Sequence, residues 1–310
     1  MNAGPIRVAL IGMGKIARDQ HLPAVRANRF FALVGTVSPD DPGVDDVPHF
    51  AQLDEFLAKG PAADAVVLCT PPQVRYELAA AAIARDMHVF LEKPPGATLS
   101  EVAALAREAS RHGVTLFAGW HSRFAACVAP ARAWLAGRAV LRAKITWRED
   151  VRVWHPGQKW IWEPGGLGVF DPGINALSIA THILPRPIFL TDARLQRPAN
   201  RAAPIAAQLA FSDATGMKVT MDLDWRQTGP QTWEIVVETA DGTLTLSEGG
   251  LVLTLPHRTM HSENLEYPGL YDRFATLIRA SLSDVDTDPL RLVADAFLRG
   301  KFETVEAFED

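Results

Sequence analysis

Three side chains in this sequence could perform acid–base chemistry on a hydroxyl group: Lys93, Asp171 and Asn175. Asp171 and Asn175 are four residues apart, so they share one face of a helix. A carboxylate with a reference pKa of about 3.9 is a weak base for an ordinary alcohol. The anomeric hydroxyl of a cyclic sugar is more acidic, because the ring oxygen withdraws charge, and a weak base aided by a cation suits it. We expect Lys93 and Asp171 to be catalytic and Asn175 to orient hydroxyls; a purely structural Lys93–Asp171 ion pair is the alternative.

The position of Lys93 in the chain supports a catalytic role. The segment 88–95 reads as a short apolar strand that ends in Glu92-Lys93 and is stopped by Pro94 and Pro95. A proline disfavours the helical conformation of the residue before it, so Lys93 is expected to be extended. Ligands of open α/β sheets bind at the carboxyl ends of strands. An ammonium group at this edge would therefore lie beside a bound ligand.

A glycine turn near the start of the chain predicts a dinucleotide site. The apolar run Ile6–Ile11 is followed directly by Gly12-Met13-Gly14-Lys15-Ile16-Ala17 and by a helical pattern through Val25. Gly12 allows a tight turn, Gly14 lets the backbone approach a pyrophosphate, and the helix N-terminus offers N–H groups to the phosphates. A merely structural glycine turn is the alternative.

The residue after the second predicted strand, Phe31–Val37, indicates which dinucleotide is preferred. NAD-selective sites carry Asp or Glu there, which binds the ribose 2′-hydroxyl. This chain has Ser38, which does not repel a 2′-phosphate and can donate to it. Ser38 favours NADP, while dual use of NADP and NAD, or a simple turn role for Ser38, stays open.

The order of predicted elements divides the chain into two domains. Strands alternate with helices up to residue 121, which predicts an α/β Rossmann domain with a doubly wound parallel sheet over residues 1–121. Ser100 is the expected N-cap of one of its helices. From residue 122 to 310, a helix over Ile174–Ile183 and consecutive strands separated by tight turns predict an α+β domain with an open, mainly antiparallel sheet. We expect this second domain to bind substrate and to form oligomers.

The composition excludes several classes of protein. The 310 residues are 48% hydrophobic and 22% charged, with a net charge of −5 and no basic stripe, so nucleic acid is not an expected partner. No apolar run approaches the ~18 residues of a membrane span, and no signal peptide is recognised. Two distant cysteines fit a reducing cytoplasm. No ligand spacing resembles a metal site.

The motifs resemble those of the Gfo/Idh/MocA oxidoreductase family. The matching residues are Gly12-x-Gly14-x-Ile16-Ala17 with His21, Glu92-Lys93-Pro94, and Gly165-Gly166 followed by Asp171. The resemblance implies a Rossmann domain, a second domain with an open mixed sheet, sugar or polyol substrates, and a homodimer or homotetramer formed through that sheet. Many members carry a histidine where this chain has Asn175, which cannot exchange a proton near neutral pH. That departure resembles the aldose 1-dehydrogenase branch, which acts on L-arabinose and D-galactose.

The resemblance also assigns side chains to the two ligands. The sugar pocket would be lined by Asn175, His121, Trp154, His155 and Trp233, with Glu149 as a possible hydroxyl acceptor or, alternatively, a solvated surface residue. The expected cofactor-binding residues are Gly12, Met13, Gly14, Lys15, Ile16, Ser38, Thr70, Pro71, Glu92 and Lys93. Trp134, Trp147 and Trp225 are expected in the core or an interface, and Arg75 and Arg123 at the surface or facing phosphate.

The sequence thus predicts an NADP-preferring sugar 1-dehydrogenase that forms an aldonolactone by hydride transfer. One alternative is a dehydrogenase of another polyol or cyclic alcohol. Another is a non-catalytic regulator that senses NADP, which would need neither Lys93 nor Asp171.

Overall fold

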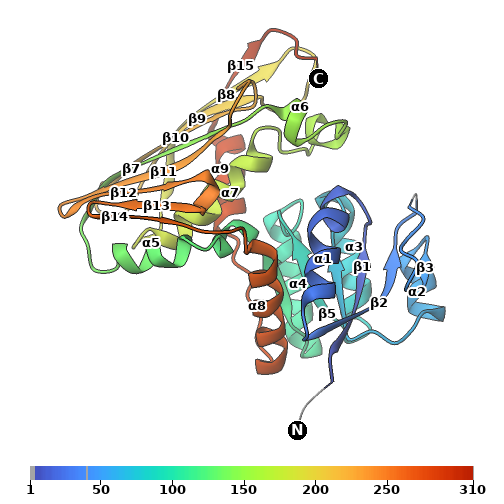
Figure 1. The fold of residues 1–310 in the computed structure, drawn as a ribbon. Coiled ribbons are helices and arrows are strands. Elements are labelled where there is room, and N and C mark those ends of the chain that lie inside the picture. Colours follow the sequence, from blue (N-terminus) through green and yellow to red (C-terminus); the bar gives the residue numbers. More distant parts are fainter. Residues whose placement is uncertain (1–3, 40, 310) are drawn as a thin grey trace. The chain divides into compact units, whose positions relative to one another are not determined.

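The computed structural model describes residues 4–39 and 41–309, which fold into two compact units (Figure 1). Unit 1 contains the chain up to His121 together with Tyr267–Thr287. Unit 2 contains Ser122–Glu266 and the chain from Asp288 onward. The expected second domain, 122–310, therefore differs from the structure over residues 267–287.

Unit 1 is a Rossmann domain with six parallel strands in the order β3-β2-β1-β4-β5-β6. The strands are β1 (Ile6–Ile11), β2 (Phe31–Val37), β3 (His49–Phe50), β4 (Ala65–Leu68), β5 (His88–Glu92) and β6 (Leu116–Gly119). The helices are η1 (Ala17–His21), α1 (Leu22–Ala27), α2 (Leu53–Lys59), α3 (Pro72–Ile83), α4 (Leu99–His112) and α8 (Glu266–Ala280). Every residue of β4 is buried, as expected for a strand with helices on both faces.

Aromatic packing explains why the segment 267–287 belongs to unit 1. On α8, the ring of Phe274 stacks on Phe31 and Phe117, with centroids 5.9 Å apart in both pairs. Tyr271 packs edge-on against Phe31 at 5.4 Å and lies 5.6 Å from Phe90. These rings cover the apolar side chains of the sheet, which residues 1–121 alone would leave partly exposed. Local sequence patterns do not predict this contact, because the partners are more than 150 residues apart.

The start of α4 differs from the expectation at Ser100. The N-cap is Thr98, whose hydroxyl accepts the Glu101 backbone N–H at 3.2 Å. The Glu101 carboxylate in turn accepts the Thr98 backbone N–H at 3.3 Å, completing a capping box. Thr98 is favoured over Ser100 because only Thr98 has a glutamate three residues later. The C-cap of the helix is Gly113, with a φ of 67°.

Unit 2 contains an open nine-stranded sheet in the order β14-β13-β12-β11-β7-β10-β9-β8-β15. Its pairs are antiparallel except for β10 with β7 and β15 with β8, so the sheet is mixed but mainly antiparallel. The strands are β7 (Val140–Arg148), β8 (Phe189–Pro198), β9 (Ala206–Ser212), β10 (Lys218–Asp224), β11 (Thr232–Thr239), β12 (Gly242–Ser247), β13 (Val252–Leu255), β14 (Arg258–His261) and β15 (Lys301–Val305).

Helices cover one face of this sheet and leave the other open (Figure 1). The helices are η2 (His121–Phe124), α5 (Val128–Leu135), α6 (Val151–Trp154), η3 (Lys159–Trp162), α7 (Phe170–Ile183), η4 (Glu248–Gly250) and α9 (Asp288–Arg299). Along β7, Ala143, Ile145 and Trp147 are buried, whereas Arg142 and Lys144 are exposed. This alternation is typical of a strand with one solvated face.

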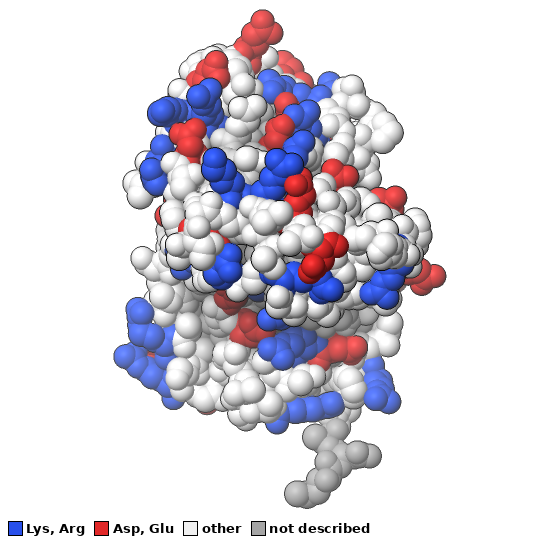
Figure 2. All heavy atoms as spheres, turned by 90° about the vertical axis from the view of Figure 1, so that its left-hand side faces the viewer, with Lys and Arg blue, Asp and Glu red and all other residues white. Residues whose placement is uncertain are grey.

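The helix α7 begins four residues earlier than the predicted Ile174, at Phe170. Pro172 is tolerated in the first turn of a helix, where its missing N–H would have no intrahelical partner. Asp171 therefore lies inside the first turn of α7, one turn before Asn175. None of the described helices is long and apolar enough to cross a membrane. On the side of the molecule shown in Figure 2, basic and acidic side chains are interspersed.

Candidate active site

The glycine turn after β1 has the shape that a dinucleotide requires. Gly12 has a φ of 87°, and a Cβ there would lie 2.8 Å from the Thr70 side chain, so only glycine fits. At Gly14, no atom would lie within 4 Å of an added Cβ, which leaves its backbone open to a ligand. Helical turns follow directly, through η1 into α1, and the first N–H groups of a helix have no intrahelical partner. The turn thus fits a bound pyrophosphate.

The other expected cofactor residues surround this turn. Met13 is buried beneath it, whereas Lys15 and Ile16 are exposed, and the Lys15 ammonium pairs with Asp19. Thr70 is half-buried and Pro71 is exposed, both in the loop between β4 and α3.

The loop after β2 is contacted by Arg18, a cation that was not among the predicted cofactor residues. Ser38 follows Val37 at the strand end, and its carbonyl oxygen lies 3.0 Å from His49 Nε2, which must therefore carry the proton. Arg18, from η1, reaches into the same loop. Its guanidinium donates to both oxygens of Asp41, at 2.5 and 3.0 Å, and to the Gly43 carbonyl at 2.9 Å. The pairing with Arg18 lowers the pKa of Asp41 below its usual range, against the opposing effect of burial.

Arg75 corrects the expectation of a surface or phosphate-facing side chain, because it is only 2% exposed. Its guanidinium donates to the carbonyl oxygens of Thr70, Glu92 and Pro94. It thereby joins the loop after β4 to the Glu-Lys-Pro turn after β5. The sequence did contain a signal: a residue in the first turn of the helix after β4 lies at the carboxyl edge of the sheet.

A buried group of polar side chains lies beneath the Glu-Lys-Pro turn. The Glu92 carboxylate is 3% exposed; it accepts the Tyr267 hydroxyl at 2.8 Å and the Lys93 backbone N–H, and lies 3.2 Å from His21 Nε2. His21 is fully buried, and its Nδ1 lies 2.8 Å from the Tyr271 hydroxyl. Glu92 is therefore held by contacts on both of its oxygens.

The two charged members of this group stabilise each other. Burial lowers the pKa of His21, but the neighbouring Cys69 and Glu92 outweigh it and raise that pKa to about 9. Burial raises the pKa of Glu92, but the hydrogen bond and charge of His21 outweigh it and lower that pKa to about 2. At neutral pH the pair is thus an imidazolium and a carboxylate.

In unit 2, Glu149 follows β7 and is only 2% exposed, which rules out the solvated-surface alternative. Its Oε1 accepts the indole N–H of Trp225 at 3.2 Å, and its Oε2 accepts that of Trp233 at 2.8 Å. Each carboxylate oxygen has two lone-pair sites, so Glu149 keeps acceptor capacity. Trp225 is completely buried, as expected for a core residue.

His155 lies between two carboxylates. Its Nε2 is 3.3 Å from Glu149 Oε1, and its Nδ1 is 3.6 Å from Asp171 Oδ2. The Asp171 side chain is 5% exposed and the His155 side chain 15%. The structure therefore brings together three of the predicted residues, Glu149, His155 and Asp171, in one line of acceptor and donor groups. Asn175, on the next turn of α7, is half-buried.

Indole rings border this line of polar groups. Trp154, at the end of α6, is 40% exposed, and its ring lies 4.8 Å from Trp233. Trp233 also stacks on Trp147, with centroids 5.8 Å apart. An exposed indole beside hydroxyl-binding groups is suited to the apolar C–H face of a sugar ring.

The remaining predicted residues, Lys93 and His121, belong to unit 1. Lys93 directly follows β5, and His121 begins η2, where its ring stacks on Tyr267 with centroids 5.4 Å apart.

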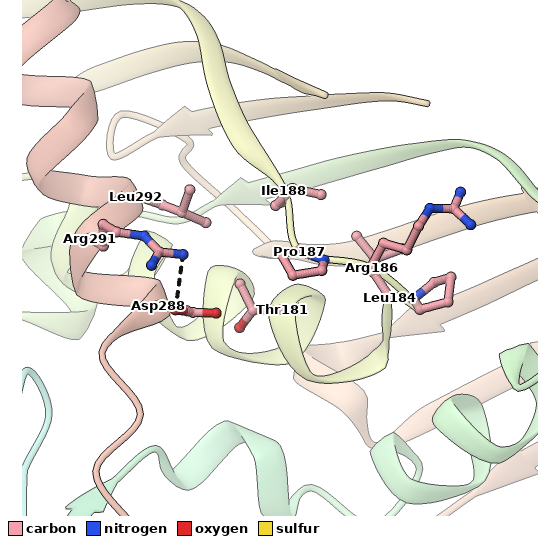
Figure 3. Close-up of a pocket in the computed structure, with 9 residues that line it drawn as sticks. Thr181, Leu184, Arg186, Pro187, Ile188, Asp288, Arg291 and Leu292 are labelled. Carbon is pink, nitrogen blue, oxygen red and sulfur yellow. Dashed lines mark ion pairs between the residues drawn. The ribbon is translucent and has the colours of Figure 1, made fainter. Parts of the chain in front are cut away.

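A pocket elsewhere in unit 2 contains none of the predicted residues. It lies between the end of α7 and the start of α9, and Figure 3 shows the Asp288–Arg291 ion pair, of 3.0 Å, at its edge beside Thr181. We therefore do not assign it to the active site. Within residues 4–39 and 41–309, no group of three or more His, Cys, Asp or Glu side chains could hold a metal ion.

The chain as a whole is similar to several known proteins. The matching family model, described as an oxidoreductase family with an NAD-binding Rossmann fold, covers residues 6–120. The chain is 46% identical over 307 residues to galactose 1-dehydrogenase of Pseudomonas fluorescens, with 99% of both chains covered. A crystal structure of a D-galactose-1-dehydrogenase protein from Rhizobium etli matches with a TM-score of 0.96 and 54% identity, over 100% of this chain and 99% of that one. A 3-ketoreductase from Actinomadura kijaniata, in complex with NADP and TDP-benzene, has a TM-score of 0.83, 16% identity and coverage of 99% and 100%, which shows the fold alone.

Proposed function

This chain is a member of the Gfo/Idh/MocA oxidoreductase family, and we propose that it oxidises the anomeric carbon of an aldopyranose to the aldonolactone. D-Galactose is the first substrate to consider, since a relative that matches the chain end to end is named for that sugar. L-Arabinose has the same arrangement of the hydroxyls concerned and is the second.

The observation that carries this proposal is the line formed by Glu149, His155 and Asp171 beside the exposed Trp154. It offers hydrogen-bond acceptors and a ring nitrogen to hydroxyls, and an apolar ring face to sugar carbons. Asp171 ends the line, and its carboxylate can take a proton. A regulator that only senses the cofactor would not need these groups.

In the proposed reaction, Asp171 takes the proton of the C1 hydroxyl, and Lys93 stabilises the oxygen as charge develops on it. A nicotinamide dinucleotide held at the Gly12–Gly14 turn would supply the oxidising power, by accepting the hydride of C1. Asn175 orients the sugar hydroxyls, as do His121, His155 and Glu149, while Trp154 and Trp233 contact the apolar face of the ring. The C1–O single bond becomes the lactone carbonyl.

We assign the cofactor preference to the loop after β2. The family binds a nicotinamide dinucleotide, and Ser38 carries no charge that would repel a 2′-phosphate. Arg18, from η1, adds a guanidinium that reaches this loop, and arginine is well suited to phosphate. Because Arg18 is paired with Asp41, whose carboxylate could instead receive a ribose hydroxyl, our proposal is NADP preference with retained use of NAD.

We also propose that the enzyme is a cytoplasmic homodimer or homotetramer formed through the open face of the unit 2 sheet. A shallow groove on that face includes Lys144, Arg194, Asp192 and Asp222. Both signs of charge in one patch allow two copies to pair. Both cysteines are free thiols, which suits a reducing compartment. Light scattering of wild-type protein and of Lys144→Glu tests the interface, because the variant should dissociate.

The function is tested by following NADPH absorbance with purified protein and NADP. We expect reduction with D-galactose and L-arabinose and none with myo-inositol, which has no anomeric carbon. Signal with inositol alone would move the reaction to a ring carbinol. Tight NADP binding without turnover of any sugar would support a regulator.

A further inference from the structure

We propose that Tyr267 and His21 are positioning residues: both hold the Glu92 carboxylate, which accepts the Lys93 backbone N–H. The ring of Tyr267 also stacks on His121 and holds it in place. This inference rests on the function proposed above, because only there are Lys93 and His121 assigned to a reaction. Neither Tyr267 nor His21 is assigned a contact with the sugar or the dinucleotide in that proposal.

The Glu92 carboxylate connects Tyr267 and His21 to the backbone of Lys93. One carboxylate oxygen accepts the Lys93 backbone N–H. The other accepts the Tyr267 hydroxyl at 2.8 Å and lies 3.2 Å from His21. The direction of the Lys93 backbone therefore depends on a carboxylate that Tyr267 and His21 hold in place.

Tyr267 contacts both Glu92 and His121, in addition to the ring of His21. Its hydroxyl donates to Glu92, and its ring stacks on His121 with an interplanar angle of 17°. His121 is the last residue of unit 1 before the chain enters unit 2, and Tyr267 is the first residue after it returns. One side chain thus contacts both the Glu-Lys-Pro turn and a proposed sugar-binding histidine.

The surroundings of Glu92 and His21 favour the charged form of both side chains. Glu92 faces His21, Lys93 and His121, all of which favour its ionised form. His21 faces Cys69, Glu92 and the Tyr271 hydroxyl, and is edge-on to the rings of Phe90 and Tyr267. Burial raises the pKa of Tyr271 well above its usual value, so its hydroxyl stays neutral and can accept from the imidazolium. Every polar atom of the His21–Glu92 pair named here therefore has a partner in the charged state.

The His21–Glu92 ion pair is better explained by orientation than by stability. Replacing a buried ion pair by well-packed apolar side chains is often neutral or stabilising, so stability alone gives little reason for this pair in an aromatic core. An ion pair with directed hydrogen bonds fixes orientation instead. At a reaction centre, a displacement of about 1 Å can cost roughly a hundredfold in rate.

The test compares three tyrosine variants, Tyr267→Phe, Tyr271→Phe and Tyr76→Phe, with wild-type enzyme. Tyr76 lies in α3, packs against the apolar core of unit 1, and has no place in the group, so it is the matched control. We expect Tyr267→Phe to lower kcat by about tenfold or more while the dissociation constant for NADP stays unchanged. Tyr271→Phe should have a smaller effect of the same kind, and Tyr76→Phe should have none.

A pH profile separates positioning from stability. In wild-type enzyme, kcat should fall as pH rises through about 9, where His21 loses its proton. His21→Gln retains a donor toward Glu92 but cannot titrate, so this fall should disappear from its profile.

A wild-type kcat in Tyr267→Phe would overturn this inference and leave the proposed function standing. The same holds for equal losses of kcat in all three tyrosine variants, and for an alkaline fall of kcat that His21→Gln leaves unchanged. An inactive wild-type enzyme would instead overturn the proposed function, and this inference with it.

Discussion

Each unit of this protein contains a buried glutamate beside a histidine. The two pairs differ in how far the histidine is exposed to solvent. Glu92 and His21 are 3.2 Å apart, and Glu149 and His155 are 3.3 Å apart. Aromatic side chains donate to both carboxylates: Tyr267 to Glu92, and Trp225 and Trp233 to Glu149. His21 is completely buried, whereas the His155 side chain remains 15% exposed.

The difference shows that the role of a Glu–His pair depends on the groups around it. The first pair is enclosed by the rings of α8, and what it holds is the backbone of Lys93. The second continues to Asp171 and is bordered by the exposed Trp154. We therefore assign support of the site to the first pair and binding of the sugar to the second.

The largest effect on kcat should follow replacement of Lys93 or Asp171. Each is a proposed reacting group that lies next to one of the two pairs. Lys93→Ala and Asp171→Asn should each lower kcat by roughly 10²–10⁴-fold, the usual contribution of a positioned acid or base. Their melting temperatures should stay close to the wild-type value, because neither change opens a large cavity. Steady-state kinetics and calorimetry measure both quantities. Normal turnover by both variants would show that neither residue is catalytic.

Replacement of the two histidines should then separate the pairs. His21 has its pKa raised from 6.5 to about 9, so its charge contributes stability that is complete below pH 6.5 and lost as pH rises through about 9. The shift corresponds to about 3 kcal/mol. Denaturant unfolding of wild-type protein should show this loss between pH 6.5 and 9.5, and His21→Gln should lack it.

His155→Gln is the matched change in the other pair. It should raise KM for the sugar by about tenfold through lost hydroxyl contacts, with little change in unfolding. If His21→Gln altered only KM, or His155→Gln only stability, the roles of the two pairs would have to be exchanged.

A change outside both pairs sharpens the comparison. Ser38→Asp should lower the ratio of kcat/KM with NADP to that with NAD by about tenfold or more, because a carboxylate repels the 2′-phosphate. The unfolding of the protein and KM for the sugar should not move. An unchanged ratio would exclude Ser38 as the selector and leave Arg18 as the residue to replace.

The smallest effect is expected at Asn175. Asn175→Ala should raise KM for the sugar several-fold, the value of about one hydrogen bond, with kcat nearly retained. Complete loss of turnover would mean that Asn175 takes part in the chemical step.

The sequence predicted the parts of this site that depend on local pattern. The glycine turn before a helix, the strand ended by Glu92-Lys93-Pro94, and the one-turn spacing of Asp171 and Asn175 can all be recognised within a few residues. The glycine turn and the alternation of strands and helices were sufficient to predict the Rossmann fold. The open second sheet was predicted from consecutive strands with tight turns and from the family resemblance.

The parts that were missed depend on long-range contacts. Tyr271 is 250 residues from His21, and Arg18 is separated from Asp41 by the helix α1 and the strand β2. No periodicity specifies such partners, because the packing of α8 on the sheet sets the first contact and the course of the loop after β2 sets the second. The burial of Arg75 and Glu149 was missed for the same reason, since charged side chains are usually exposed unless a partner lies opposite.

The central claim, hydride transfer from C1, is tested most directly with D-galactose that carries deuterium at C1. NADP is reduced with this sugar, and the NADPH is examined by NMR for deuterium at C4 of the nicotinamide. Our account predicts deuterated NADPH and an unlabelled aldonolactone. Unlabelled NADPH, with deuterium retained in the sugar product, would contradict it and place the oxidation at another carbon.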